Sequence, residues 1–373
     1  MEIYVHIPFC VKKCSYCDFF SGPHTAEEQK RYFDELKEEI VLTPYGGGTV
    51  SSVFFGGGTP SIAEPSEIAA VLECIRKMFH VEGDAEISME ANPGTLTAEK
   101  LYVYQQAGVK RLSLGLQSPD DGMLKKLGRI HDYETFLRSY EAARAAGFTN
   151  VNIDLMSGLP GETAEGFEKG LKQVLALKPE HLSVYSLIIE ENTPFYALYG
   201  ENPDGTPAEK AWELPGEETD RLIYHRTGEI LAENGYERYE ISNYARQGFA
   251  CRHNIGYWTG EEYLGFGAAA ASYVDGKRFK NPAKMDYLSG PYEETEVLTE
   301  DVKRAEFMIL GLRMTRGVSE AEFERRFGRK MEDIYGDVIR KHEKYGTITR
   351  AEGRVFLTEY GLDAANIVMA DFL

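Results

Sequence analysis

Short apolar runs alternate with longer amphipathic stretches over the first half of the chain. The short runs have the length and composition of buried strands, and the longer stretches repeat apolar residues at helical spacing. The predicted strands are Ile3–Phe9, Ser52–Gly56, Glu86–Glu90, Arg111–Gln117, Val151–Leu155 and His181–Ile189. Helices are predicted between them, for example at Glu27–Leu42, Glu64–Phe79 and Tyr133–Ala146.

This alternation predicts a parallel sheet with helices on its outer face, because strand–helix–strand units cross over in the right-handed sense. Gly108 and Gly147 support the order, since each ends a predicted helix just before the next apolar run. In barrels of this kind the reactive groups gather at the C-terminal ends of the strands. We therefore expect an α/β domain whose functional site lies at that edge.

The pattern changes after Ile189. Residues 190–216 contain four prolines together with several Asn, Asp and Gly residues, a composition typical of a long surface connection. A helix at Glu217–Asn234 and a strand-like run at Tyr236–Ile241 follow. We interpret 191–297 as a linker and accessory region that follows a domain of residues 1–190.

Residues 298–373 predict a small α+β domain. Its expected elements are helices at Glu300–Leu312, after Ser319 and at Glu332–Tyr345, a hairpin of Thr347–Thr349 and Arg354–Leu357, and a last helix that ends at Ala370. The pair Ser319 and Glu322 has the spacing of a capping box, which marks the start of a helix. Helices followed by a two-stranded wing predict a winged-helix-like fold.

The formal net charge of −19 disfavours polyanionic partners. Proteins that bind nucleic acid or anionic membranes neutralise phosphates with Lys and Arg. Residues 301–373 hold 13 basic and 13 acidic side chains, so the winged-helix-like domain lacks the basic excess of a DNA-binding module. We expect no nucleic-acid partner and interpret this domain as a lid or docking module.

The hydropathy pattern contains no apolar run of the roughly 18 residues that a transmembrane helix needs. The first predicted strand begins two residues after Met1, which leaves no room for a leader peptide. We therefore expect a cytoplasmic protein without a transmembrane segment.

Cys10, Cys14 and Cys17 are three of the five cysteines and have the spacing C-x3-C-x2-C. Cysteine thiolates hold iron–sulfur clusters, so three of them on one loop can bind three corners of a cubane cluster and leave its fourth iron open. Structural zinc is the alternative, but it needs four ligands and His24 is the nearest candidate for the fourth. A disulfide is disfavoured because the number is odd and no secretory signal precedes the motif.

The segment from Tyr4 to Cys17, with the aromatic Tyr16 before the last cysteine, resembles the radical S-adenosylmethionine (SAM) superfamily. In detail it is similar to the branch that contains oxygen-independent coproporphyrinogen dehydrogenase and the haem chaperones of the HemW group. The resemblance implies a partial (β/α)6 barrel, a [4Fe–4S] cluster on the three cysteines, and SAM bound to the open iron.

The resemblance also includes glycines and polar residues at the ends of the predicted strands. A triple glycine lets a ligand approach the main chain closely, and an acidic residue at a strand tip can hold ribose hydroxyls. Alone, the glycines would indicate a turn, and Glu90 would pair with an arginine or cap a helix. By the resemblance, the positions that contact SAM are Tyr4, Tyr16, Gly57, Gly58, Thr59, Glu90, Gln117, Arg129 and Asp154.

A second motif lies in the accessory region. His253, Asn254, Tyr257 and Trp258 resemble the HNxxYW motif of the HemW group, which is associated with haem. Neutral imidazole is a good ligand for haem iron. The alternative from the residues alone is a hydrogen-bonded histidine beside a core tryptophan.

Two functions from different classes fit these features. One is a haem chaperone that transfers haem to an acceptor protein; the other is coproporphyrinogen III dehydrogenase, which decarboxylates propionates oxidatively. Either protein would need an electron donor for the cluster. A haem-degrading methyltransferase is a third, less favoured alternative. Phe19 stands where the dehydrogenase branch has a further cysteine, that branch's N-terminal extension is not present before Met1, and the HNxxYW motif is complete. All three features favour the chaperone, and no catalytic residue is predicted.

Overall fold

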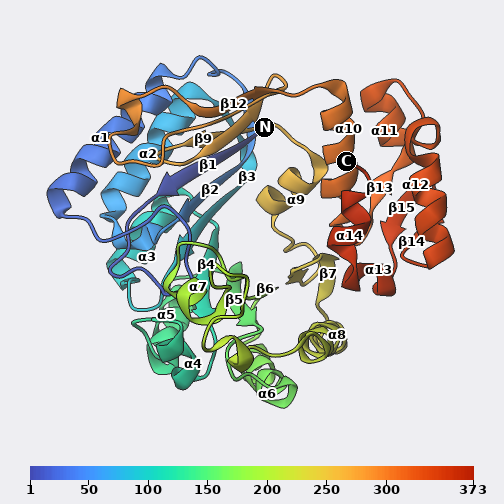
Figure 1. The fold of residues 1–373 in the computed structure, drawn as a ribbon. Helices are drawn as coiled ribbons and strands as arrows, with labels where there is room; N and C mark the ends of the chain where they lie inside the picture. Colours follow the sequence, from blue (N-terminus) through green and yellow to red (C-terminus); the bar gives the residue numbers. More distant parts are fainter.

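Six parallel strands form the centre of a twelve-stranded sheet (Figure 1). The computed structural model describes residues 1–373, and its parallel strands are neighbours in chain order. They are β1 (Glu2–Ile7), β2 (Thr49–Gly57), β3 (His80–Ala91), β4 (Arg111–Gln117), β5 (Val151–Ser157) and β6 (His181–Ser186). All the strands predicted for this half of the chain are present, and β4 has the predicted bounds.

Helices cover the outer face of this sheet, as the alternating pattern predicts (Figure 1). They are α1 (Ala26–Leu42), α2 (Pro65–Met78), α3 (Ala98–Ala107), α4 (Asp121–Lys126), α5 (Tyr133–Ala145) and α6 (Ala164–Leu175). Thr25 starts α1 with a complete capping box, which satisfies backbone N–H groups of the first turn. Val53 and Phe55 of β2 join the core beneath these helices, so the alternate residues Ser52 and Phe54 face the inside of the sheet.

The sheet remains open, because further strands extend both of its edges instead of closing it. At one edge β9 (Tyr263–Phe266) runs parallel to β1, followed by β10 (Ala271–Val274), β11 (Lys277–Lys280) and β12 (Glu293–Val297). At the other edge β8 (Asn243–Ala245) and β7 (Glu237–Glu240) follow β6. The architecture is a partial barrel with six strand–helix units, as expected.

The predicted surface connection after Ile189 was only partly right. A short helix, α7 (Pro194–Tyr199), lies within it and buries Phe195 and Tyr199 in a small apolar cluster with Leu159. The hydroxyl of Thr193 caps this helix. The prolines indicated a surface connection, so the helix was not predicted. Its two buried aromatic residues nevertheless have the helical spacing i, i+4.

The rest of residues 191–297 packs as part of the barrel. It contains α8 (Glu217–Glu233), α9 (Arg252–Thr259) and short 3-10 helices at Ala211–Glu213 and Tyr287–Ser289. Ile230, Leu264 and Phe279 belong to the same core of 52 buried residues as the parallel strands. The predicted boundary at residue 190 therefore does not coincide with a boundary of the core, and the division of the chain at 190 and 297 stays a prediction.

The C-terminal residues form a separate unit with its own core of 14 buried residues. Its elements are α10 (Glu300–Leu312), β13 (Val318–Ser319), α11 (Glu320–Phe327), α12 (Met331–Tyr345), β14 (Ile348–Ala351), β15 (Arg354–Leu357), α13 (Glu359–Asp363) and α14 (Ala365–Ala370). The hydroxyl of Ser319 caps α11. The sheet order β13-β15-β14 gives the predicted winged-helix-like arrangement, although the last predicted helix is divided into two.

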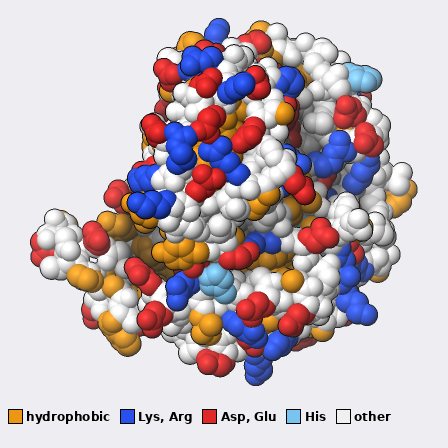
Figure 2. Space-filling view, turned by 90° about the vertical axis from the view of Figure 1, so that its right-hand side faces the viewer, with side chains coloured by type: hydrophobic (Ala, Val, Ile, Leu, Met, Phe, Trp, Pro, Cys, Tyr) orange, Lys and Arg blue, Asp and Glu red, His pale blue; other side chains and the backbone are white.

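Basic and acidic side chains are mixed on the face that carries this C-terminal unit (Figure 2). Arg325 and Arg326 both pair with Glu322, and Arg350 pairs with Glu332. The positive charges of α11 and the wing are thus largely matched within the unit. None of the helices in the structure joins an apolar composition to the length that crossing a lipid bilayer requires.

Helix α9 lies against the inner face of the sheet. His253 stacks on Phe54 of β2, with ring centroids 5.0 Å apart, and Gly256 faces the buried carboxylate of Glu2 at the start of β1. A Cβ atom at Gly256 would lie 1.9 Å from Glu2 Oε1. A glycine is required there because any side chain would collide with this carboxylate.

We expect Gly256→Ala to lower the free energy of unfolding by about 1–3 kcal/mol, as overpacking does in other cores. Urea denaturation measures the change. Gly228→Ala in α8 is the matched control, because a Cβ atom there would have its nearest neighbour at 3.7 Å. Alanine is the better helix former, so this control should leave stability equal or raise it by up to about 1 kcal/mol. Equal stability of the two variants would contradict the packing described for α9.

Candidate functional site

A cavity of about 530 Å³ lies inside the curve of the sheet, and the cysteine loop borders it. Strand ends and interior side chains of β2 to β6 supply the rest of its wall, in line with the expected position of the site. The predicted residues that line it are Cys10, Cys14, Tyr16, Cys17, Gly57, Gly58, Glu90, Gln117, Arg129, Asp154 and Asn254. Folding thus brings together groups that are spread over more than half of the chain.

The cysteine loop is held by backbone and side-chain hydrogen bonds. The N–H of Cys10 donates to the carbonyl of Gly22 (2.9 Å), and the N–H of Ser15 donates to the carbonyl of Leu127 (3.0 Å). Arg129 Nη1 lies 3.5 Å from Cys14 Sγ. The guanidinium thereby ties the second cysteine of the motif to the segment that follows α4.

A hydrogen-bonded chain connects Arg129 with the glycine-rich turn. Arg129 Nη2 donates to Asn92 Oδ1 (2.7 Å), and Asn92 Nδ2 donates to the hydroxyl of Thr59 (2.6 Å). Thr59 Oγ1 in turn lies 3.6 Å from Cys10 Sγ. Thr59 therefore lies behind the cavity wall, where it couples the turn after β2 to the first cysteine.

The donor set fits an iron–sulfur cluster better than a single metal ion. No group of three or more His, Cys, Asp or Glu side chains in the structure converges on one point, as a zinc ion would require. In a cubane cluster each thiolate binds a different iron, so three thiols around one cavity suffice. His24 does not line the cavity, and its Nδ1 is engaged with the carbonyl of Gly22 (2.9 Å).

The glycine-rich turn brings main chain to the cavity wall. Gly57 has φ 108°, and a Cβ atom there would lie 2.5 Å from the ring of His6. A Cβ atom at Gly58 would lie 2.7 Å from the carbonyl oxygen of Phe9. Both positions therefore require glycine, and the N–H of Gly57 donates to Glu90 Oε2 (3.1 Å).

Two half-buried carboxyl groups, those of Glu90 and Asp154, line the cavity. Burial, and then the nearby Asp154 carboxylate, raise the pKa of Glu90 to about 8. Burial also raises the pKa of Asp154, although hydrogen bonds from Asn152 (2.7 Å) and Ser113 (3.0 Å) oppose this effect. Glu90 is thus mostly protonated at neutral pH in the chain without ligands.

The remaining predicted SAM contacts occupy the rim and the layer behind it. Gln117 ends β4 with φ 71° and accepts a hydrogen bond from the hydroxyl of Tyr185 (3.0 Å). Tyr16 packs edge-on against Phe195 of α7. Tyr4 does not line the cavity, and its hydroxyl lies 3.0 Å from His6 Nδ1.

The first residue of the HNxxYW motif, His253, is buried against the sheet. His253 is 2% exposed, and its Nδ1 lies 2.8 Å from the hydroxyl of Ser52. Burial, and then the charge of Arg111, lower the pKa of His253 to about 3, so its imidazole is neutral. Its Nε2 atom has no hydrogen-bond partner, but the ring is enclosed by the sheet.

The other three motif residues have different surroundings. Tyr257 packs edge-on against the His253 ring, with centroids 4.9 Å apart. Trp258 lies beneath the guanidinium of Arg313, 4.4 Å from the ring centroid, and so connects α9 with the segment after α10. Of the four motif residues, Asn254 alone lines the cavity.

Several residues of the cavity wall were not predicted from the sequence, and two of them are Asn92 and Arg111. Asn92 bridges Thr59 and Arg129, and its signal was its position two residues after Glu90 at the end of β3. Arg111 lines the cavity from the first position of β4 and is buried. Its signal was a charged residue at the start of an otherwise apolar strand.

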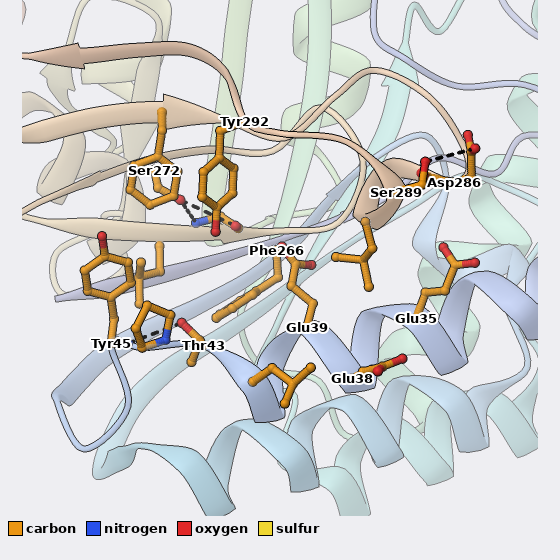
Figure 3. A pocket seen from close by; sticks show the side chains of 16 residues that line it. Glu35, Glu38, Glu39, Thr43, Tyr45, Phe266, Ser272, Asp286, Ser289 and Tyr292 are labelled. Carbon is orange, nitrogen blue, oxygen red and sulfur yellow. Dashed lines mark hydrogen bonds between the residues drawn. The ribbon is translucent and has the colours of Figure 1, made fainter.

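A second cavity, of about 510 Å³, lies between α1 and the strands β9 to β11 (Figure 3). Its wall combines aromatic residues such as Tyr45 and Tyr292 with acidic residues of α1. Glu39 is the most enclosed of these, and its carboxylate accepts hydrogen bonds from Asn281 (2.6 Å) and Tyr287 (2.9 Å). None of the residues predicted to bind the cluster, SAM or haem lies there.

Family models match both parts of the chain. The model of the radical SAM superfamily matches residues 4–174, and the model of the HemN C-terminal domain matches residues 298–363. The first match contains the cysteine loop and the strands β1 to β5. The second covers the C-terminal unit from α10 to α13.

Relatives and one solved structure extend over almost the whole chain. The haem chaperone HemW of Bacillus subtilis is 36% identical, with 99% of this chain and 98% of that protein covered. HemW of Escherichia coli is 34% identical, with 100% and 98% covered. The structure of coproporphyrinogen III oxidase (HemN) from E. coli, a radical SAM enzyme, is similar with a TM-score of 0.83 and 25% identity, and covers 100% of this chain and 89% of HemN. Because these similarities include the cavity, its cysteine loop and the C-terminal unit, the chain belongs to the HemW family within the radical SAM superfamily.

Proposed function

We propose that the protein is a haem chaperone that binds a [4Fe–4S] cluster, SAM and haem, and transfers the haem to an acceptor protein. The observation that carries this proposal is the similarity to HemW proteins over nearly the full length of both chains. The cavity supports it, because the cysteine loop and the polar strand ends meet there.

Cys10, Cys14 and Cys17 would hold the cluster. When bound, the cluster and SAM supply one-electron chemistry, which requires an external electron donor. The protein's own contribution is to hold the three cysteines in place and to shield them from water. Arg129 contacts Cys14, and α7 with Tyr16 covers one side of the loop.

The predicted SAM residues are proposed to act in two layers. Those on the cavity wall would touch SAM: the main chain of Gly57 and Gly58, with Glu90, Gln117, Arg129, Asp154 and Tyr16. Tyr4 and Thr59 would act from behind, since Tyr4 bonds to His6 and Thr59 to Asn92. A cavity already lined by these groups needs little rearrangement to bind its ligand.

The HNxxYW residues are proposed to belong to the haem site. Asn254 would contribute directly, from the cavity floor. Coordination of haem iron by His253 would require α9 to leave the sheet, because the ring is enclosed and bonded to Ser52. Tyr257 and Trp258 fix the position of this helix against His253 and Arg313.

Coproporphyrinogen III dehydrogenase activity is the second candidate. The fold similarity to HemN, with a TM-score of 0.83, favours it. Phe19 argues against it, because this side chain stands where the dehydrogenase branch has a further cysteine. It is 66% exposed beside the cavity mouth.

The two candidates differ in their products. We expect anaerobically reconstituted protein, supplied with SAM and a reductant, to bind haem stably and to form no protoporphyrinogen IX from coproporphyrinogen III. Absorbance in the Soret region and chromatography of the porphyrins measure these outcomes. Turnover of coproporphyrinogen III would replace the chaperone proposal with the dehydrogenase.

Replacing a cluster ligand should remove the cluster without unfolding the chain. We expect Cys14→Ser to lose most of the bound iron and the visible absorbance of the cluster, because a serine hydroxyl is a poor iron ligand. Cys74→Ser is the control, since Cys74 lies on α2 outside the cavity. Iron analysis and circular dichroism of both proteins provide the test, and full iron content in Cys14→Ser would exclude this residue as a ligand.

The pKa of Glu90 predicts a pH dependence of SAM binding. Below pH 8 the carboxyl is mostly protonated, so it loses the negative charge that favours a cationic ligand. We expect SAM affinity to rise by up to about tenfold per pH unit towards pH 8. Calorimetric titration measures this dependence, which Glu90→Gln should abolish.

Glu162→Gln is the matched control for this measurement. Burial raises the pKa of Glu162 to about 7, but this residue lies outside the cavity that contains the cysteines. The control should retain the pH dependence of the unmodified protein. A Glu90→Gln variant with unchanged pH dependence would show that another group is titrating.

A further inference from the structure

Arg111 is a buried cation at the floor of the cavity and has no partner in the protein. Its side chain is 2% exposed and lines the cavity from the first position of β4. The guanidinium donates no hydrogen bond to the protein and has no carboxylate oxygen within 4 Å, and its Nε atom has no partner. A buried charge without a partner destabilises a fold, so its presence calls for an explanation.

The two acidic residues nearest to Arg111 are already bound by other groups. Asp154 accepts from Ser113 and Asn152. Glu86 accepts from the hydroxyl of Ser88 (3.3 Å) and the backbone N–H of Arg252 (3.2 Å). These hydrogen bonds occupy both carboxylates, and neither carboxylate pairs with Arg111.

The wall around Arg111 is polar and mostly uncharged. Ser113, Asn152, Ser183, Asn243 and Asn254 share it. Such a wall offers hydrogen bonds, and the acidic groups of the cavity that interact with the guanidinium are Asp154 and Glu90. Gly57 and Gln117 lie at the C-terminal ends of their strands, whereas Arg111 begins β4, so the floor lies away from these expected SAM contacts.

We propose that Arg111 binds the carboxylate of a ligand held in this cavity, and that in the haem complex this carboxylate is a propionate of haem. The haem part rests on the function proposed above. A guanidinium presents two parallel N–H donors to a carboxylate, the strongest arrangement for such a pair. Within a desolvated cavity the charge of Arg111 would thus be compensated by the ligand.

This subsite gives the HNxxYW motif a direct contact with haem that does not involve the iron. Asn254 lies on the same floor as Arg111, so its side-chain amide is placed to donate to the same carboxylate. His253 positions Asn254, because its bond to Ser52 and its stack on Phe54 fix the first turn of α9.

The test compares haem with haem dimethyl ester, in which both propionate charges are removed. Soret titration under anaerobic conditions, with the cluster and SAM present, gives the affinity for each compound. We expect the unmodified protein to bind haem about 10- to 100-fold more tightly than the ester, the range for a hydrogen-bonded charge. Arg111→Gln should lose this preference by weakening haem binding, while its affinity for the ester stays the same.

Two further variants separate charge from packing. Arg111→Lys keeps the charge but not the paired donors, and should retain part of the preference for haem. Arg252→Gln is the matched control: Arg252 lies at the start of α9, pairs with Asp84 and does not line the cavity, so the preference should remain. An equal loss of haem and ester binding in Arg111→Gln, or no loss at all, would overturn the subsite.

If the proposed function is wrong, the unmodified protein will bind neither haem nor its ester, which distinguishes this outcome from those above. In that case the carboxylate subsite is tested with sodium propionate against sodium chloride at equal ionic strength. Propionate should raise the midpoint of thermal unfolding of the unmodified protein and have no such effect on Arg111→Gln. The same response in both proteins would overturn it.

Discussion

Polar groups inside the curved sheet impose the constraint on which the rest of the site depends. Inner faces of the parallel strands carry carboxylates, amides and a guanidinium in the interior of the fold. Each such group must find a partner or destabilise the fold. Asn152 shows the solution: its amide donates to Ser113 and Asp154, and its oxygen faces His181 Nδ1 at 2.6 Å. Polar side chains on neighbouring strands thus satisfy one another's hydrogen bonds.

The same constraint organises the two ends of the cavity. At the end that contains the cysteine loop, Asn92 forms hydrogen bonds with both Thr59 and Arg129. It thereby connects the glycine-rich turn to the cysteine loop. At the lower end, α9 closes the inner face with His253 and Gly256 packed on the sheet. Arg111 lines the cavity without a hydrogen-bonded partner in the protein, and the proposed ligand carboxylate would balance its charge.

The local pattern of apolar and polar residues predicted much of the fold. Arg111–Gln117 and Glu300–Leu312 have their predicted bounds, because strand and helix periodicity are properties of neighbouring residues. The helix α7 was missed because its stability comes from burial of Phe195 and Tyr199 against residues distant in sequence. The strands β9 to β12 are short, and their pairing at the sheet edge likewise depends on contacts that periodicity does not encode.

The order of strands and helices, the spacing of the three cysteines and the resemblance to the radical SAM superfamily can be read from the sequence alone. These features reside in residues that are close along the chain. Which side of each strand faces inward depends on how the strands pack in the folded protein. The tertiary structure therefore decided that His253 is enclosed, that Asn254 reaches the cavity, and that Arg111 is buried without a partner. Burial and pairing arise where separate segments meet, so no local pattern records them.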